Sequence, residues 1–140
     1  MEIELLPLDS SLPRAEGWPP PFWEETLGLV AGGGQDSAWA IAADGELVGV
    51  IGASDRGDGA AQVGYGVVAT REGRGVATAA LLAVVERLRR DGFSGVVGDT
   101  FDDHVSSRRV MEKAGMRLVA TKREDVDGEE RDLVVYELVF

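Results

Sequence analysis

The segment from residue 63 to residue 90 constrains the fold of this 140-residue chain more than any other. Residues 63–69 form a short apolar, β-branched run that predicts a strand, and residues 76–90 carry apolar side chains at helical spacing. Between them, Gly73 and Gly75 lack a Cβ, so the backbone can approach a ligand closely. The first N–H groups of a helix have no partner within it and lie at the positive end of its dipole. The segment therefore predicts an anion site suited to phosphate, with a glycine turn that binds nothing as the alternative.

Two common nucleotide-binding motifs do not fit this segment. A P-loop has a Lys-Ser/Thr pair after its second glycine, where this chain has Val76 and Ala77. A match to the dinucleotide fingerprint, Gly64-x-Gly66-x-x-Ala69, lies inside the predicted strand and does not open a helix. The phosphate ligand must therefore belong to another class.

The loop resembles the acyl-coenzyme-A loop of the GNAT superfamily of N-acetyltransferases, whose pattern is Gln/Arg-x-x-Gly-x-Gly/Ala. Here it reads Glu72-Gly-Arg-Gly-Val-Ala77, with a glutamate at the first position, so we expect Glu72 to point away from the phosphate. Residues 104–116 resemble the second GNAT signature, Asn-x-x-Ser/Ala-x-x-Val/Phe-Tyr/Leu-Glu-Lys-x-Gly-Phe. The match is closest to the branch that contains the ribosomal-protein N-terminal acetyltransferases. Together the two signatures cover about half of the chain.

The resemblance implies an enzyme that transfers acetyl from acetyl-CoA directly to a primary amine, on a protein N-terminus or a small molecule, without a metal. In the family, a bulge at the end of the fourth strand pairs with the pantetheine arm, and Val67 and Val68 occupy that place. The residues that the resemblance assigns to the cofactor are Val67, Val68, Gly73, Arg74, Gly75, Val76, Ala77, Thr78 and His104. An inactive GNAT-shaped module that binds acyl-CoA or a partner is the alternative, and Glu72, Met111 and a short acceptor-side region favour it.

Acetyl transfer needs a base for the ammonium proton and help for the leaving thiolate. The family pattern places a base, acting through a water, at Asp99; a carboxylate exposed at a strand end, or bonded to a loop, is the alternative. Ser107 lies at helical spacing with inward-facing apolar residues, and in the resembled branch a serine here lies near the cofactor sulfur; a serine bonded to its own helix is the alternative. Met111 replaces the usual acidic tyrosine, and His104 replaces the usual asparagine.

Composition limits the other possibilities. The chain is long enough for one domain, residues 1–140, and has no cysteine for a disulfide or a nucleophile. A net charge of −11 argues against nucleic-acid binding, and no apolar run is long enough to span a membrane, so we expect a cytoplasmic protein, monomeric or homodimeric. Residues 71–117 carry a charge of +2 and the remainder −13, which suits an anionic cofactor and a cationic amine, or simply solubility.

The element pattern predicts a mixed α/β fold, with a mostly antiparallel sheet of about seven strands flanked by about three helices. Asp44-Gly45 and Asp127-Gly128 are expected to turn two hairpins. Trp18, Phe22 and Trp23 either line an acceptor pocket or anchor a loop to the core. The expected strands are residues 1–8, 38–43, 46–53, 63–69, 94–101, 116–122 and 132–140, and the expected helices are a short one near residue 25, 76–90 and 103–114.

Overall fold

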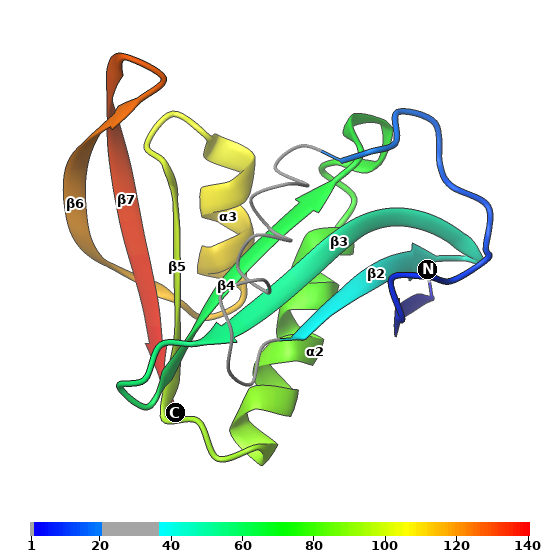
Figure 1. Ribbon diagram of the computed structural model, residues 1–140, viewed down its shortest axis with the longest axis horizontal. Helices are drawn as coiled ribbons and strands as arrows, with labels where there is room; N and C mark the ends of the chain where they lie inside the picture. The colour runs from blue at the N-terminus through cyan, green and yellow to red at the C-terminus, as the bar shows by residue number, and fades with distance from the viewer. Residues whose placement is uncertain (1, 21–36) are drawn as a thin grey trace.

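The computed structural model of the protein describes residues 2–20 and 37–140, and within them seven strands form one mixed sheet (Figure 1). The strand order is β1-β2-β3-β4-β5-β7-β6, and every neighbouring pair is antiparallel except β4 with β5. The strands are β1 (Ile3–Leu6), β2 (Ser37–Ala43), β3 (Glu46–Asp55), β4 (Ala60–Val67), β5 (Gly95–Phe101), β6 (Arg117–Val126) and β7 (Glu129–Val139). The predicted mixed, mostly antiparallel sheet is confirmed.

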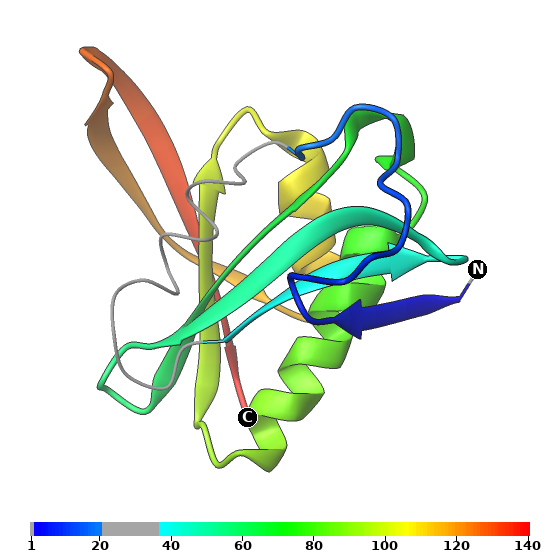
Figure 2. The same cartoon turned by 45° about the vertical axis from the view of Figure 1, so that its right-hand side comes forward.

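Two helices, α2 (Val76–Arg90) and α3 (Val105–Lys113), pack against the sheet (Figures 1 and 2). The apolar stripe of α2 shares a buried cluster with side chains of β2, β3, β4 and β5, and Met111 of α3 belongs to the same cluster. A smaller cluster of Ala40, Ala42 and Leu47 contacts Leu12 and Trp18 from the N-terminal segment. The N-terminal segment thus anchors to the β2–β3 hairpin, whereas α2 and α3 build the main core.

The feature that positions the site is the short pairing of β4 with β5. The two strands pair only at residues 60–62 with residues 95–97, after which β4 continues beside β3 to Val67 and β5 continues beside β7 to Phe101. Beyond Gln62 and Val97 the facing edges of β4 and β5 have no strand between them. The parallel pair therefore opens toward the carboxyl ends of both strands.

Several predicted boundaries are confirmed. The α2 helix has the predicted bounds, because its apolar stripe ends where Asp91 and Gly92 close it. Asp44 and Gly45 both have positive φ, 51° and 83°, as a type I′ turn requires. The predicted short helix near residue 25 lies outside the described residues.

Other boundaries differ from the prediction. The fourth strand runs from Ala60 to Val67 instead of 63–69, because the Val68 carbonyl accepts the Arg71 N–H and starts a short 3-10 turn, η1 (Ala69–Arg71). The helix α3 begins at Val105, two residues later than predicted, since His104 is its N-cap with non-helical backbone angles. The β6–β7 hairpin extends to Val126 and Glu129, and Figure 2 shows it projecting from the body of the protein.

We predict that Gly49 cannot be replaced by alanine without a large loss of stability. A Cβ at Gly49 would lie 2.4 Å from the Gly66 carbonyl oxygen, and this backbone atom cannot move without separating β3 from β4. Overpacking of this kind costs about 2–3 kcal/mol, so urea unfolding of Gly49→Ala should show a correspondingly lower free energy of unfolding.

Gly98→Ala is the matched control for this prediction. Its Cβ would meet the sulfur of Met111 at 3.0 Å, and an unbranched thioether can move aside. We expect this variant to differ from the parent by no more than about 1 kcal/mol. Equal destabilisation of the two variants would mean that the close backbone approach at Gly49 is not what makes it intolerant.

Candidate functional site

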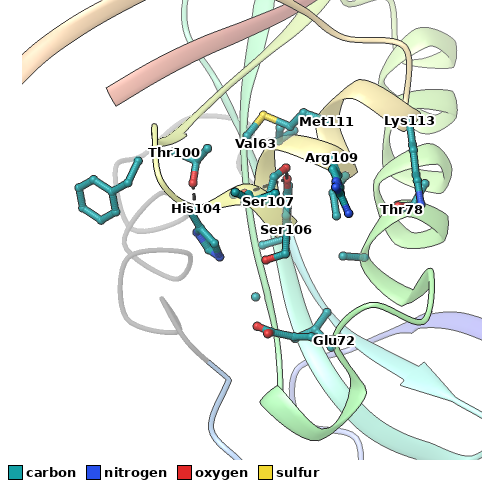
Figure 3. Close-up of a pocket in the computed structure, with 18 of the residues that line it drawn as sticks. Val63, Glu72, Thr78, Thr100, His104, Ser106, Ser107, Arg109, Met111 and Lys113 are labelled. Carbon is teal, nitrogen blue, oxygen red and sulfur yellow. Dashed lines mark hydrogen bonds between the residues drawn. The ribbon is translucent and has the colours of Figure 1, made fainter. Parts of the chain in front are cut away.

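A cavity of about 710 Å³ lies where β4 and β5 separate (Figure 3). Its walls come from β4, the loop before α2, the first turn of α2, the end of β5 and α3, with Val126 and Leu133 from the β6–β7 hairpin. Its size is within the roughly 300–1,000 Å³ of small-molecule sites. The sequence-predicted site residues that line it are Val67, Gly73, Gly75, Val76, Ala77, Thr78, Asp99, His104 and Ser107.

The N-terminus of α2 faces this cavity with its backbone groups open. Gly75 is the N-cap residue, in the left-handed conformation with φ of 83°, and no side chain caps the helix. The first turn contains no acidic residue, and Val76, Ala77 and Thr78 line the cavity. A Cβ at Gly73 or Gly75 would meet nothing within 4 Å, so a ligand can approach this backbone closely. These features fit the diphosphate of an acyl-CoA.

Two residues assigned to the cofactor are not brought to the cavity. The side chain of Val68 is fully buried in the core, its N–H donates to the Val48 carbonyl at 2.8 Å, and its carbonyl accepts the Arg71 N–H. The β3–β4 ladder also reaches Val67 without a register shift, so the expected bulge is absent from this pairing. Arg74 is exposed and lies outside the cavity lining.

The prediction that Glu72 points away from the ligand site is not supported. Glu72 lines the cavity, and Figure 3 shows its side chain at the edge of the pocket. The neighbouring Arg71 also lines the cavity, but its guanidinium is paired with the carboxylate of Glu46 from the β2–β3 hairpin. The loop of residues 72–75, called the phosphate loop below after its predicted ligand, is thereby fixed to the sheet at its start.

A tyrosine and a serine that both line the cavity are hydrogen-bonded to each other. Tyr65 of β4 places its hydroxyl 3.0 Å from the Ser107 carbonyl oxygen and 3.2 Å from Ser107 Oγ on α3. Burial raises the pKa of Tyr65 to about 12, an effect that the hydrogen bond to Ser107 partly offsets. Tyr65 therefore stays neutral, and a hydrogen-bond donor, at physiological pH. Its importance was not evident from the sequence, because no motif links two residues 42 positions apart.

The second of the two tyrosines in the chain, Tyr136, has a structural position. It is 1% exposed, lies outside the cavity lining, donates to Glu112 Oε2 at 3.1 Å and accepts from Arg108 Nε at 3.1 Å. These bonds tie α3 to β7. Met111, at the position of the usual acidic tyrosine, is buried against Gly98. Tyr65 is thus the tyrosine that the fold brings to the cavity among the described residues.

Asp99 lines the cavity from β5. Its side chain is exposed, and Oδ2 lies 3.5 Å from Nζ of Lys122 on β6. The pKa of Lys122 is raised, first by the hydrogen bond that its ammonium donates to Glu124 and also by Asp99, so this ammonium stays charged at neutral pH. Lys122 therefore cannot accept a proton from an amine there, whereas Asp99 is a cavity carboxylate that can.

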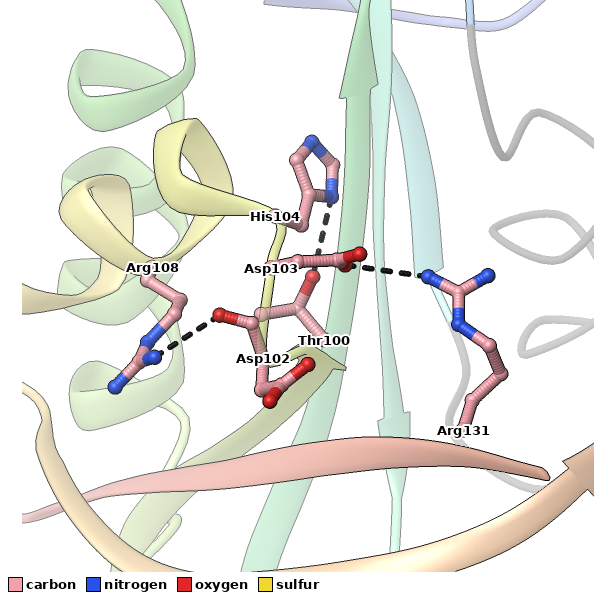
Figure 4. A network of polar contacts seen from close by, with 6 residues as sticks. All are labelled: Thr100, Asp102, Asp103, His104, Arg108 and Arg131. Atoms are coloured by element: carbon pink, nitrogen blue, oxygen red, sulfur yellow. Dashed lines mark hydrogen bonds and ion pairs between the residues drawn. The ribbon is translucent and has the colours of Figure 1, made fainter.

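His104 is half-buried at the start of α3 and lines the cavity (Figure 4). Its Nδ1 lies 3.2 Å from Thr100 Oγ1, which orients the ring. The loop before it is held on both sides: Arg108 donates to the Asp102 carbonyl at 3.0 Å, and Arg131 pairs with Asp103 at 3.2 Å. His104 is therefore part of a fixed cavity wall.

The aromatic residues expected near the acceptor site divide into two groups. Trp18 is half-buried, packs against both core clusters and lies outside the cavity lining, so it anchors the N-terminal loop. Phe22 and Trp23 lie outside the described residues. No group of three potential metal ligands occurs within residues 2–20 and 37–140. Within the same ranges, no helix is both long and apolar enough to cross a membrane.

The fold of the chain is similar to those of solved acetyltransferases. Mycobacterium smegmatis RimJ, solved with CoA-disulfide, is 27% identical, with a TM-score of 0.71 over 81% of this chain and 58% of that one. RimL, a ribosomal L7/L12 α-N-protein acetyltransferase solved with coenzyme A, is 21% identical, with a TM-score of 0.71 over 83% and 68%. The IAA acetyltransferase of Bacillus cereus ATCC 14579 is 17% identical, with a TM-score of 0.73 over 99% of both chains.

The chain thus spans roughly three-fifths to two-thirds of the length of the RimJ and RimL chains that it resembles. A sequence comparison with curated proteins gives no significant match. A family model described as an acetyltransferase (GNAT) domain matches residues 13–117, which include the phosphate loop, Asp99 and the whole second signature. The chain therefore belongs to the GNAT acetyltransferase domain family.

Proposed function

We propose that this protein transfers acetyl from acetyl-CoA directly to a primary amine. The observation that carries the proposal is that one cavity, at the β4–β5 opening, joins the bare N-terminus of α2 to the Tyr65–Ser107 pair and to Asp99. The α2 N-terminus can hold a diphosphate, the Tyr65–Ser107 pair can donate a hydrogen bond to a leaving sulfur, and Asp99 can accept a proton. One continuous cavity can therefore place both reacting groups.

In this mechanism Ser107 stabilises the leaving thiolate by a hydrogen bond. The single hydrogen of the Tyr65 hydroxyl is donated to the Ser107 carbonyl oxygen in the structure. When the developing thiolate takes the Ser107 hydrogen, Tyr65 can redirect its own hydrogen to Ser107 Oγ, which lies 3.2 Å away. A thiol has a pKa of about 8.5, so a charge-assisted hydrogen bond is sufficient help at neutral pH. Tyr65 then acts through Ser107 as a positioning residue.

In this mechanism Asp99 removes the proton from the ammonium form of the acceptor. An amine attacks the thioester only after its ammonium proton is removed, and the Asp99 carboxylate that lines the cavity can take that proton, directly or through a water. The acceptor we propose is a protein N-terminus or a small amine, and 18 of the 25 acidic residues lie outside residues 71–117, where they favour a cationic partner. We also propose that the protein is cytoplasmic.

The first prediction for this site concerns the phosphate loop, and it compares Gly75→Glu with Gly75→Gln. Both substitutions put a side chain of similar size at a left-handed position, so they share the same strain and bulk. Only glutamate adds a negative charge at the α2 N-terminus. We expect calorimetry to show weaker coenzyme A binding in both variants, by about a further tenfold or more in Gly75→Glu. Unchanged affinity in both would remove the loop from the site.

The second concerns Asp99. We expect Asp99→Asn to lower kcat/KM for an accepted amine by about 10²-fold, the usual scale for a general base, and to leave coenzyme A binding nearly unchanged. Asp58→Asn is the matched control, because Asp58 is an exposed carboxylate paired with Arg56 outside the cavity. A near-normal rate in Asp99→Asn would show that the amine loses its proton to solvent.

The third concerns the Tyr65–Ser107 pair. Ser107→Ala should lower kcat by about 10- to 100-fold, corresponding to about 1.5–3 kcal/mol for one donor to a charged group, and change coenzyme A binding little. Tyr65→Phe should lower kcat less. If tyrosine acts through the serine, the double variant should be no slower than Ser107→Ala alone.

Ser94→Ala is the control for this pair, since Ser94 is exposed and outside the cavity. Ser106 is unsuitable because it also lines the cavity, although its helical position differs from that of Ser107. Independent, additive effects of Tyr65→Phe and Ser107→Ala on kcat would contradict a shared role.

A further inference from the structure

One of the protein's own amines lies beside the proposed base. The chain has two lysines, Lys113 and Lys122. Nζ of Lys122, on β6, lies 3.5 Å from Oδ2 of Asp99 on β5 and 3.2 Å from Oε1 of Glu124. Within the described residues, the ammonium group that contacts Asp99 is therefore that of Lys122.

The side chain of Lys122 shares a face of the sheet with the cavity. Lys122 is paired with Leu133 of β7, and Leu133 is paired with Phe101 of β5. Directly opposite residues of antiparallel strands point to the same face, as do residues two apart in one strand. Leu133, Phe101 and Asp99 all line the cavity. Lys122 is not itself a lining residue, but its neighbours on β5 and β7 are, so its ammonium lies at the edge of the cavity.

Lys113 offers an internal comparison. It lines the cavity from α3 and is exposed, as Lys122 is. Figure 3 shows Lys113 on the side of the cavity that α2 borders, where the diphosphate is proposed to bind. Lys113 thus reports how a lysine of this cavity behaves without Asp99 beside it.

We infer that Lys122 is an intramolecular acceptor, which the protein acetylates from its own bound acetyl-CoA. The inference rests on the proposed function, because it uses the same donor and the same base. Asp99 takes a proton from the Lys122 ammonium, and the neutral Nζ then attacks the carbonyl carbon of the thioester.

The step balances without another reactant. A C–N bond forms and the C–S bond breaks, while Ser107 donates a hydrogen bond to the departing thiolate. The new amide nitrogen releases its second proton to the thiolate, and Asp99 returns the first proton to solvent. The products are Nε-acetyl-lysine at position 122, coenzyme A and one proton.

Tethering and charge determine how fast this reaction runs. Groups joined within one chain meet at an effective concentration on the order of millimolar or above, so Lys122 competes well with a dilute acceptor. The charged groups that face its ammonium are Asp99, Glu124 and Arg131, and Arg131 is itself paired with Asp103. Glu124 first and also Asp99 raise the pKa of Lys122, so acetylation should be slow at neutral pH and quicken as the pH rises.

The experiment incubates the full chain with acetyl-CoA at mildly alkaline pH and follows both lysines by peptide mass spectrometry. We expect acetylation at Lys122 to be about tenfold or more faster than at Lys113. Its rate should not depend on protein concentration, because donor and acceptor are held by one chain. Equal rates at the two lysines, or a rate proportional to protein concentration, would overturn the inference.

Asp99→Asn separates a base from a mere ion-pair partner, because the two roles have opposite signs. Loss of an ion-pair partner lowers the pKa of Lys122, which frees more neutral amine and speeds acetylation. Loss of the base should instead slow acetylation by about tenfold or more. Unchanged calorimetric binding of coenzyme A shows that the variant is folded.

Glu124→Gln is the matched control, because Glu124 also raises the pKa of Lys122 but lies outside the cavity lining. This variant should acetylate Lys122 faster than the parent. Equal slowing in Asp99→Asn and Glu124→Gln, or faster acetylation in Asp99→Asn, would contradict the inferred step.

Spermidine and a short peptide with a free N-terminus, added as probe amines, separate the inference from the proposed function. Acetylation of a probe without modification of Lys122 would overturn the inference and leave the proposed function intact. If the chain neither bound coenzyme A nor acetylated any amine, both would fail together.

Discussion

The short ladder between β4 and β5 is the constraint on which the rest of the structure depends. A parallel pair normally continues along both strands, but here it ends after three residue pairs, while β3 and β7 continue to hold the outer edges. The inner edges then face each other across a gap that must be filled or left open. In this protein one part of the gap is bridged and another part is open. The Tyr65 hydroxyl reaches across to the backbone of α3, and the space beyond becomes the cavity.

The same opening explains why the residues of the site come from distant parts of the chain. The carboxyl ends of parallel strands lie at one edge of a sheet, so the loop after β4 and the loop after β5 meet there. The first loop leads into the bare N-terminus of α2, and the second leads through His104 into α3. Helix starts that converge on one cavity direct their backbone N–H groups and first side chains toward the same ligand. A separation of the two strands by one more residue pair would move every one of these groups.

Sequence reasoning identified the local features well, because each has a local physical cause. The bounds of α2 follow from its apolar periodicity and from Gly75 and Gly92 at its ends, and the hairpins follow from turn residues that tolerate positive φ. The features that could not be predicted from the sequence depend on tertiary contacts. The use of both Val68 backbone groups by Val48 and Arg71, and the pairing of Arg71 with Glu46, could not be inferred from spacing. The contact between Tyr65 and Ser107 depends on the opening between β4 and β5, and no sequence pattern predicts that opening.

Charge in this protein is best understood by position instead of by total. The net charge of −11 describes a protein that repels anions at long range, yet its cavity must attract one if the proposed function is correct. The conflict is resolved by distance, since exposed charges are screened beyond about 8 Å at physiological salt. An anion at the cavity experiences mainly the α2 N-terminus and the exposed side chains of Arg109 and Lys113, which line the cavity. A cationic acceptor approaching from outside experiences the acidic remainder of the surface. Two basic side chains on the cavity wall of an acidic protein thus suit an anionic cofactor and a cationic acceptor at the same time.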